Sequence, residues 1–296
     1  QLVGLHNLTF YKHLMDEMRT RILDDSFATW YTTKREELVE VDRDNPIARP
    51  QKKQRPSSLV LGSYEVVEQK GFHSIRHVGS GEIMHPVSDP TEEAKTLYVN
   101  QANLAHELMR DAASPFVIWD VGMGAATNVM ATITAFEELA KTHSLARKLV
   151  IVSFENDLDS LRLAAKNPSR FPHVRHAAPA SILAHGSWTS RCGMCEWTLL
   201  EGDFAARMHE AQNACCIYYD PFSLHTDTTM WERELFVRVR EKCSADGAKL
   251  FTYSAATKIR GTLLAAGFFV GRGPATGPKL DTTAAYTTIE AVPHRA

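Results

Sequence analysis

Short apolar runs and segments with helical spacing alternate along the chain from residue 98 onward. The apolar runs have the length of buried strands and lie at residues 116–120, 148–155, 197–200, 214–219 and 249–253. Segments with apolar residues on one helical face lie at residues 98–111, 127–143, 159–167, 204–211, 230–243 and 258–266. Because crossover helices join strands that pair in parallel, this order predicts an α/β protein with a doubly wound sheet.

Two regions depart from the simple alternation. Residues 268–270 and 283–290 favour strand structure and are expected to form a closing antiparallel hairpin. Residues 166–195 contain three prolines and two glycines, and are expected to form a loop with one irregular strand. The sheet is therefore expected to end in a hairpin and to include one long connection.

Four of the predicted strands run into an acidic residue, namely Asp120, Glu155, Asp203 and Asp220. Asp is a favoured N-cap residue, so such an acid taken alone is explained by the helix that follows it. Ligands of open parallel sheets bind beyond the carboxyl ends of the strands, however, so the repetition predicts one shared ligand site. Glu155 is placed to accept hydrogen bonds from both hydroxyls of a ribose, whereas Asp203 is equally open to a capping role.

The strand that ends at Asp120 continues into a turn with Gly122 and Gly124 and then into a helix. Glycines let the backbone turn sharply and approach a ligand, and the helix offers unpaired N-terminal amides. A dinucleotide fingerprint would need a third glycine at Thr127. Its absence, with the absence of a Tyr-x-x-x-Lys pair, favours S-adenosylmethionine over NAD and argues against an NAD-linked oxidoreductase.

A family resemblance is carried by three parts of the chain: residues 120–128, residues 252–256, and the element Tyr219-Asp220-Pro221-Phe222-Ser223 followed by Trp231. Together they resemble the MnmC-like S-adenosylmethionine-dependent methyltransferases, a bacterial family that modifies the wobble uridine of tRNA. Residues 62–63, 73–74 and 80–82 resemble that family's N-terminal hairpin region, and the resemblance spans residues 57–290. The chain departs from the family at Met123 and Ala125-Ala126, where an aromatic residue and Thr-Gly are usual.

This resemblance implies the Rossmann-like, doubly wound fold of class I methyltransferases, with an N-terminal helical and hairpin extension. It implies S-adenosyl-L-methionine as cofactor, and N-methylation of an aminomethyl group on a tRNA wobble uridine as activity. The expected cofactor-binding residues are Asp120, Gly122, Gly124, Asn128, Glu155 and Asp203.

Asp220 is the expected catalytic residue. An amine has to be neutral to attack a methyl group, and a carboxylate can accept a hydrogen bond from it and later take up or relay the released proton. Aromatic side chains near Asp220 can stack on a base, although the same residues are alternatively core aromatics. The expected substrate-binding residues are Phe222, Ser223, Trp231 and Tyr253. His73 and His225 are interpreted as packing or surface histidines.

Charge and composition restrict the partners. The chain has 296 residues, 44% of them apolar, and a net charge of −2. It can therefore bury a full α/β core, but no overall positive field attracts nucleic acid. A basic cluster with Lys52, Lys53 and Arg55 is interpreted as a solvated linker or as a local arm that contacts tRNA phosphates. We expect a helical extension with this basic linker, an accessory hairpin with a lead-in helix, and the methyltransferase domain, at residues 1–56, 57–115 and 116–296.

The five cysteines are odd in number and spread over a large chain, which indicates a reducing compartment and a cytoplasmic location. Cys192 and Cys195 lack a second pair at zinc-binding spacing, so we expect a hairpin turn there and no metal site. No apolar run is long enough to span a membrane. The chain begins at Gln1 rather than Met, which is compatible with the removal of a leader.

Two other functions fit the same pattern. The acceptor is alternatively an amine on a small molecule or a peptide. The chain is alternatively a non-catalytic, Rossmann-like binding subunit, because the altered turn at residues 122–126 departs from the family's pattern. The pattern leaves the identity of the acceptor and the oligomeric state open.

Overall fold

The computed structural model describes residues 2–39, 59–85, 89–275, 280–289 and 292. The chain divides between Gln54 and Arg55 into an N-terminal unit and a larger second unit. The predicted basic linker with Lys52 and Lys53 lies outside the described residues, as does Arg55. In the described ranges, no helix is both long enough and apolar enough to cross a membrane.

The N-terminal unit is a pair of helices, α1 (Leu2–Leu23) and α2 (Phe27–Val39). The chain reverses between them at Asp25, whose φ of 57° lies in the left-handed region that Asp tolerates. The indole N–H of Trp30 on α2 donates a hydrogen bond of 2.8 Å to Glu17 on α1. These helices form the predicted N-terminal helical extension.

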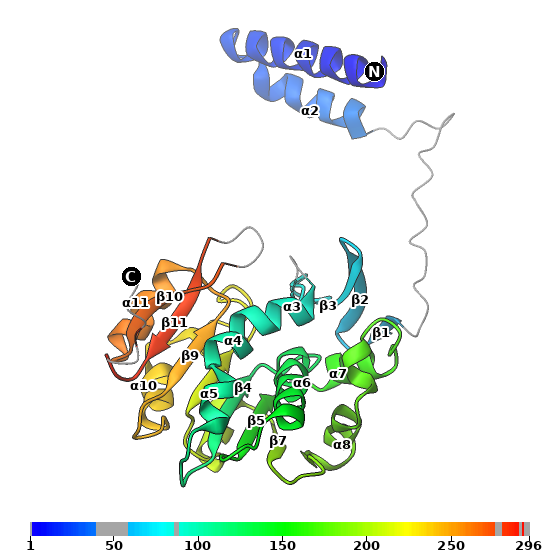
Figure 1. The fold of residues 1–296 in the computed structure, drawn as a ribbon. Helices are drawn as coiled ribbons and strands as arrows, with labels where there is room; N and C mark the ends of the chain where they lie inside the picture. Colours follow the sequence, from blue (N-terminus) through cyan, green and yellow to red (C-terminus); the bar gives the residue numbers. More distant parts are fainter. Residues whose placement is uncertain (1, 40–58, 86–88, 276–279, 290–291, 293–296) are drawn as a thin grey trace. The chain divides into compact units, whose positions relative to one another are not determined.

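The second unit is built around an eight-stranded sheet with the order β10-β11-β9-β8-β4-β5-β7-β6 (Figure 1). The pairs from β9 to β7 are parallel, as the alternation of strands and helices predicts. The predicted closing hairpin is present as β10 and β11, and β6 adds an antiparallel strand at the other edge. The strands are β4 (Phe116–Val121), β5 (Leu149–Glu155), β6 (Ser187–Thr189), β7 (Cys195–Glu201), β8 (Cys216–Tyr219), β9 (Lys249–Thr252), β10 (Phe269–Gly273) and β11 (Thr282–Tyr286).

Helices cover both faces of this sheet, which confirms the doubly wound fold. Successive residues of a strand point to opposite faces, so Ile118 packs in one core while Trp119 packs in the other. The first core includes Ile133 of α6, and the second includes Phe236 of α10. The main helices are α6 (Thr127–Thr142), α7 (Asp159–Ala165), α8 (Ala177–His185), α9 (Phe204–Arg207), α10 (Arg233–Glu241) and α11 (Thr257–Ala265).

The single helix predicted at residues 98–111 is wrong in its bounds. Helical structure begins earlier, at Pro90, because the Asp89 side chain caps it by accepting a hydrogen bond of 2.9 Å from the Thr91 N–H. It is interrupted at Asn103, whose φ is 53°. The segments are α3 (Pro90–Ala94), a π-helical turn (Lys95–Val99), α4 (Asn100–Ala102) and α5 (Leu104–Met109).

The long connection at residues 166–195 is more regular than predicted. Pro179 lies in the first turn of α8, where a helix does not need the missing N–H. Gly186 ends α8 with a φ of 68°, and β6 follows directly. Pro179 and Gly186, two of the residues that suggested a loop, therefore mark the two ends of a helix.

The predicted hairpin turn at Cys192 and Cys195 is confirmed, because it joins β6 to β7. The N–H of Ser190 donates a hydrogen bond of 2.9 Å to the carbonyl of Cys195 across this turn. Cys192 is exposed, whereas Cys195 is buried in the core. Within the described residues, no group of three or more His, Cys, Asp or Glu side chains could hold a metal ion.

A small antiparallel sheet, formed by β1 (Val60–Leu61), β2 (Tyr64–Gln69) and β3 (Phe72–His77), precedes the large one. Tyr64 and Ile75 are buried and belong to the same core as α6. This sheet and the segment after it therefore pack beside the carboxyl ends of the central strands, where they complete the site described below.

Candidate active site

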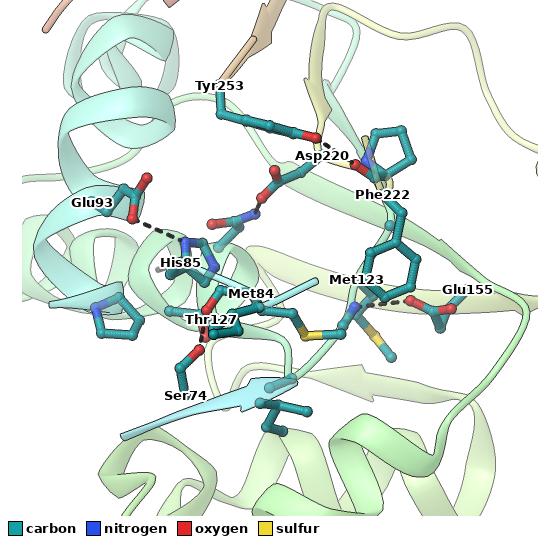
Figure 2. Close-up of a pocket in the computed structure, with 18 of the residues that line it drawn as sticks. Ser74, Met84, His85, Glu93, Met123, Thr127, Glu155, Asp220, Phe222 and Tyr253 are labelled. Carbon is teal, nitrogen blue, oxygen red and sulfur yellow. Dashed lines mark hydrogen bonds and ion pairs between the residues drawn. The ribbon is translucent and has the colours of Figure 1, made fainter. Parts of the chain in front are cut away.

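A cavity of about 520 Å³ lies at the carboxyl ends of β4, β5, β7 and β8. One wall comes from the turns after these strands, and the opposite wall from β3, the segment after it and α3 (Figure 2). Ligands of parallel sheets bind at this edge, where the strand ends diverge. Most of the predicted site residues line this cavity: Gly122, Gly124, Asn128, Glu155, Asp203, Asp220, Phe222 and Tyr253.

The glycine turn after β4 is held against the end of β8. Gly122 has a φ of 83°, and a Cβ atom there would lie 2.6 Å from the carbonyl oxygen of Asp220. A larger residue would therefore separate the two strand ends. Ala126, the residue just before α6, has a φ of 63°, a conformation that favours glycine. It is one of the two positions where the chain departs from the usual Thr-Gly.

Glu155 joins the end of β5 to the glycine turn. Its Oε2 accepts a hydrogen bond of 2.9 Å from the Gly124 N–H (Figure 2). Its Oε1 accepts hydrogen bonds from the N–H groups of Asn156 and Asp157, at 2.9 and 3.1 Å. Burial raises the pKa of Glu155, although these backbone hydrogen bonds oppose the shift. Each carboxylate oxygen can accept further hydrogen bonds, so the group can still bind a ligand.

Asp220 follows β8 and is paired with Asn128 of α6. The Nδ2 of Asn128 donates a hydrogen bond of 2.8 Å to the Oδ2 of Asp220. Burial raises the pKa of Asp220 to about 6, while the charge of His85 and the hydrogen bond from Asn128 oppose the rise. The carboxylate is therefore ionised at neutral pH and protonated in mild acid.

Two of the predicted acids have roles inside the protein. The Oδ1 of Asp203 accepts a hydrogen bond of 2.7 Å from the Ala206 N–H and so caps α9, while Asp203 also lines the cavity. Asp120 is fully buried, accepts a hydrogen bond of 2.7 Å from the Ser153 hydroxyl and lies outside the cavity lining. Burial raises the pKa of Asp120 to about 7. Direct contact between Asp120 and a ligand has no support in this arrangement.

The aromatic residues divide between the wall and the core. Phe222 and Tyr253 line the cavity, and the Tyr253 hydroxyl donates a hydrogen bond of 3.3 Å to the Pro221 carbonyl. Trp231 is buried, outside the lining, and its indole N–H donates a hydrogen bond of 2.8 Å to the Phe222 carbonyl. The helix predicted at residues 230–243 begins only at Arg233, so Trp231 lies before α10. Trp231 therefore supports the wall from behind.

Ser223 lies outside the cavity lining and also supports the wall. Its N–H and hydroxyl donate hydrogen bonds of 2.9 and 3.0 Å to the carboxylate of Glu82, a residue in the segment after β3. The hydroxyl of Thr226 donates to the same carboxylate at 2.6 Å. Glu82 thus holds the turn after β8 against the small sheet, which closes the cavity from that side.

Sequence reasoning missed His85 and Glu93, which both line the cavity. The Nδ1 of His85 lies 3.5 Å from the Oε2 of Glu93 on α3 (Figure 2). The sequence offers little signal for this pair, because the two residues come from different elements with no motif spacing. Of the two histidines predicted to be packing or surface residues, His73 lines the cavity and His225 is exposed.

The cavity fits S-adenosylmethionine in two physical respects. The Oδ1 of Asn128 is buried and has no hydrogen-bond partner among the described residues, so an acceptor is left for a polar ligand. Acidic side chains outnumber the arginines and lysines in the lining. Among the described residues of the lining, the only Arg or Lys is Arg170, and the acidic residues are Glu82, Asp89, Glu93, Glu155, Asp203, Asp220 and Asp227. Such a cavity suits a cofactor with a cationic sulfonium and an ammonium group.

The doubly wound sheet, its closing hairpin and the glycine turn define the fold of class I S-adenosylmethionine-dependent methyltransferases. Residues 172–288 match the model of a family described as S-adenosyl-L-methionine-dependent methyltransferase. The chain shares its fold with the crystal structure of MnmC2 from Aquifex aeolicus. The TM-score is 0.58 at 20% identity, over 76% of this chain and 70% of that one.

Curated relatives are bifunctional proteins named tRNA 5-methylaminomethyl-2-thiouridine biosynthesis protein MnmC. The protein from Methylibium petroleiphilum is 27% identical over 215 residues, which cover 70% of this chain and 32% of the relative. The protein from Aeromonas salmonicida is 25% identical over 67% of this chain and 32% of the relative. The chain spans about a third of the length of these relatives. The chain is thus similar to the MnmC-like S-adenosylmethionine-dependent methyltransferases in sequence and in fold.

Proposed function

We propose that this protein transfers a methyl group from S-adenosylmethionine to an aminomethyl group on the wobble uridine of tRNA. The observation that carries the proposal is that Asp220 lines the same cavity as Gly124 and Glu155. A carboxylate that can orient an amine thus shares a cavity with the groups suited to the methyl donor. The choice of acceptor is based on the names of the MnmC relatives, which refer to 5-methylaminomethyl-2-thiouridine biosynthesis in tRNA.

Five residues would hold the cofactor, and one of them is Asn128, whose buried Oδ1 would accept a hydrogen bond from it. Gly122 and Gly124 let the backbone approach it, and Glu155 would accept hydrogen bonds from the ribose hydroxyls. Asp203 would accept one from the adenine amino group. When bound, the cofactor supplies an electrophilic methyl group on a sulfonium, so the protein mainly has to align the acceptor and exclude water.

Asp220 would orient the acceptor nitrogen. Asn128 fixes one carboxylate oxygen of Asp220 through the hydrogen bond of 2.8 Å. The other oxygen is then available to accept a hydrogen bond from a neutral amine. Phe222 and Tyr253 add apolar walls that suit a planar base.

The partner and location follow from the same assignment. We assign contact with tRNA phosphates to the basic segment around Lys52, Lys53 and Arg55, because the net charge of −2 gives no general attraction. A cytoplasmic location is supported by the five unpaired cysteines.

The test supplies the purified protein with labelled S-adenosylmethionine and bulk tRNA that carries unmethylated aminomethyl-uridine. An unmodified transcript of the same tRNA is the matched control, because it lacks the amine. Label in the bulk tRNA and none in the transcript is the expected result. Label only in a pool of small amines or peptides would replace the tRNA acceptor, and failure to bind the cofactor would favour a non-catalytic binding subunit.

A further inference from the structure

We propose that His85, positioned by Glu93, accepts the proton that the substrate's ammonium group loses before methyl transfer. This role rests on the proposed function, because it requires an amine acceptor beside Asp220. His85 would touch the reacting nitrogen, whereas Glu93 acts through His85.

The geometry places His85 between two carboxylates. Its Nδ1 lies 3.5 Å from the Oε2 of Glu93, and the two side chains are 14% and 9% exposed. Figure 2 shows the imidazole between Glu93 and Asp220. Pairing at Nδ1 fixes the orientation of the ring and leaves Nε2 for a ligand in the cavity.

The backbone of His85 is held in an unusual conformation. Its φ of 50° lies in the left-handed region, which costs energy for a residue with a side chain. Nearby, the Ser74 hydroxyl donates a hydrogen bond to the carbonyl of the preceding residue, Met84, and the Met84 N–H donates one of 2.9 Å to Ile75. The small sheet therefore anchors the residue before His85. Strain of this kind is concentrated at functional sites.

Titratable groups on three elements face His85. Glu93 on α3 and Asp89 just before it are negative, Asp220 after β8 is negative, and His173 lies on the turn at residues 172–175. Burial disfavours the imidazolium, but the hydrogen bond to Glu93 and the three carboxylates outweigh it, so the pKa of His85 is raised. A stronger base takes a proton from an alkylammonium more readily.

An alkylammonium has no lone pair, so its proton first moves to Nε2 of His85, which leaves a neutral amine beside Asp220 and an imidazolium. The amine nitrogen then bonds to the methyl carbon as the carbon–sulfur bond breaks, giving a methylated ammonium and a neutral thioether. The imidazolium afterwards gives its proton to water at the cavity mouth.

The first test is an NMR titration of the histidine ring in the cofactor-free protein, assigned by loss of its signals in His85→Asn. We expect the pKa of His85 to fall in Glu93→Gln and in Asp220→Asn, because each removes a negative charge. His225→Asn, which alters an exposed histidine outside the lining, should leave it unchanged. A wild-type His85 that titrates as in a free peptide, unmoved by these variants, would overturn the pairing.

The second test is the pH dependence of kcat in the active enzyme. His85→Asn should lower kcat about a hundredfold and remove the acidic limb that belongs to the imidazole, with cofactor Kd changed less than about threefold. Glu93→Gln should move that limb to lower pH and lower the maximal rate about tenfold. His225→Asn should match the wild type.

The outcomes separate the two hypotheses. Methyl transfer by the wild type with an unchanged rate and pH profile in His85→Asn would overturn the role of His85 and leave the proposed function intact. Absence of transfer from the wild type to any amine would overturn the proposed function and this role with it.

Discussion

The side-chain amide of Asn128 donates a hydrogen bond of 2.8 Å to Asp220, which joins the first turn of α6 to the end of β8. The sequence assigned these residues to different tasks, one to the cofactor and the other to catalysis. The hydrogen bond couples them, because Asn128 also sets the orientation and the charge of the Asp220 carboxylate. A change at Asn128 should therefore alter catalysis through Asp220.

Asn128→Ala tests this coupling. The hydrogen bond from Asn128 lowers the pKa of Asp220, so its loss should raise that pKa above about 6 and leave less carboxylate ionised at neutral pH. We expect kcat to fall about tenfold at pH 7 and to recover partly at pH 8. The pH dependence of kcat is the measurement, and a loss of the same size at every pH would contradict the coupling.

Asp120→Asn should stabilise the protein in mild alkali. The pKa of Asp120 is raised to about 7 in the folded protein, from an ordinary value near 3.8. The folded state therefore binds more protons between these values, and stability falls as the pH rises through that window. Removing the charge should make the free energy of unfolding at pH 8 higher by about 2 kcal/mol and reduce its slope with pH. Denaturant unfolding at pH 5 and pH 8 measures this, and an unchanged slope would contradict the burial of a charge.

Glu155→Gln should weaken cofactor binding. The carboxylate already accepts hydrogen bonds from Gly124 and two further N–H groups, and it would accept those of the ribose hydroxyls. We expect a loss of about 1–3 kcal/mol in binding S-adenosylmethionine, the cost of losing a hydrogen bond to a charged group. Calorimetric titration gives the Kd, with Glu201→Gln on the neighbouring strand as an exposed control. Equal affinity in the two variants would rule out the ribose contact.

Asp203 can be separated into a cap and a ligand. Asn caps a helix about as well as Asp, so Asp203→Asn should keep the stability of α9. Asp203→Ala should lose about 1 kcal/mol of stability. If Asp203 also accepts from the adenine amino group, both variants should bind the cofactor more weakly. Thermal unfolding and Kd together decide, and unchanged affinity in both would leave Asp203 as a cap alone.

The sequence predicts the part of the fold that depends on local periodicity. The parallel strands and the helices after them follow from apolar spacing, and the glycine turn from the conformations that Gly122 and Gly124 adopt. It fails where local rules compete with tertiary packing. Residues 98–111 look like one helix, but Asn103 interrupts them in a left-handed conformation.

The sequence predicts only the part of the candidate site that the strand ends form. Glu155 and Asp220 stand at strand ends, where topology brings them together. His85, Glu93 and Glu82 come from the small sheet and α3, and only the packing of those elements on the strand ends places them in the cavity. Trp231 is the opposite case: the sequence predicts it to bind the substrate, but it is buried behind the cavity wall.

In the proposed function, Asp220 orients the acceptor and leaves cofactor binding to other groups. The most direct test measures S-adenosylmethionine Kd and methyl transfer to aminomethyl-containing tRNA in wild type and Asp220→Ala on the same protein samples. We predict a Kd within about threefold of wild type and a kcat at least about a hundredfold lower. Methyl transfer at the wild-type rate in Asp220→Ala would show that Asp220 does not orient the acceptor.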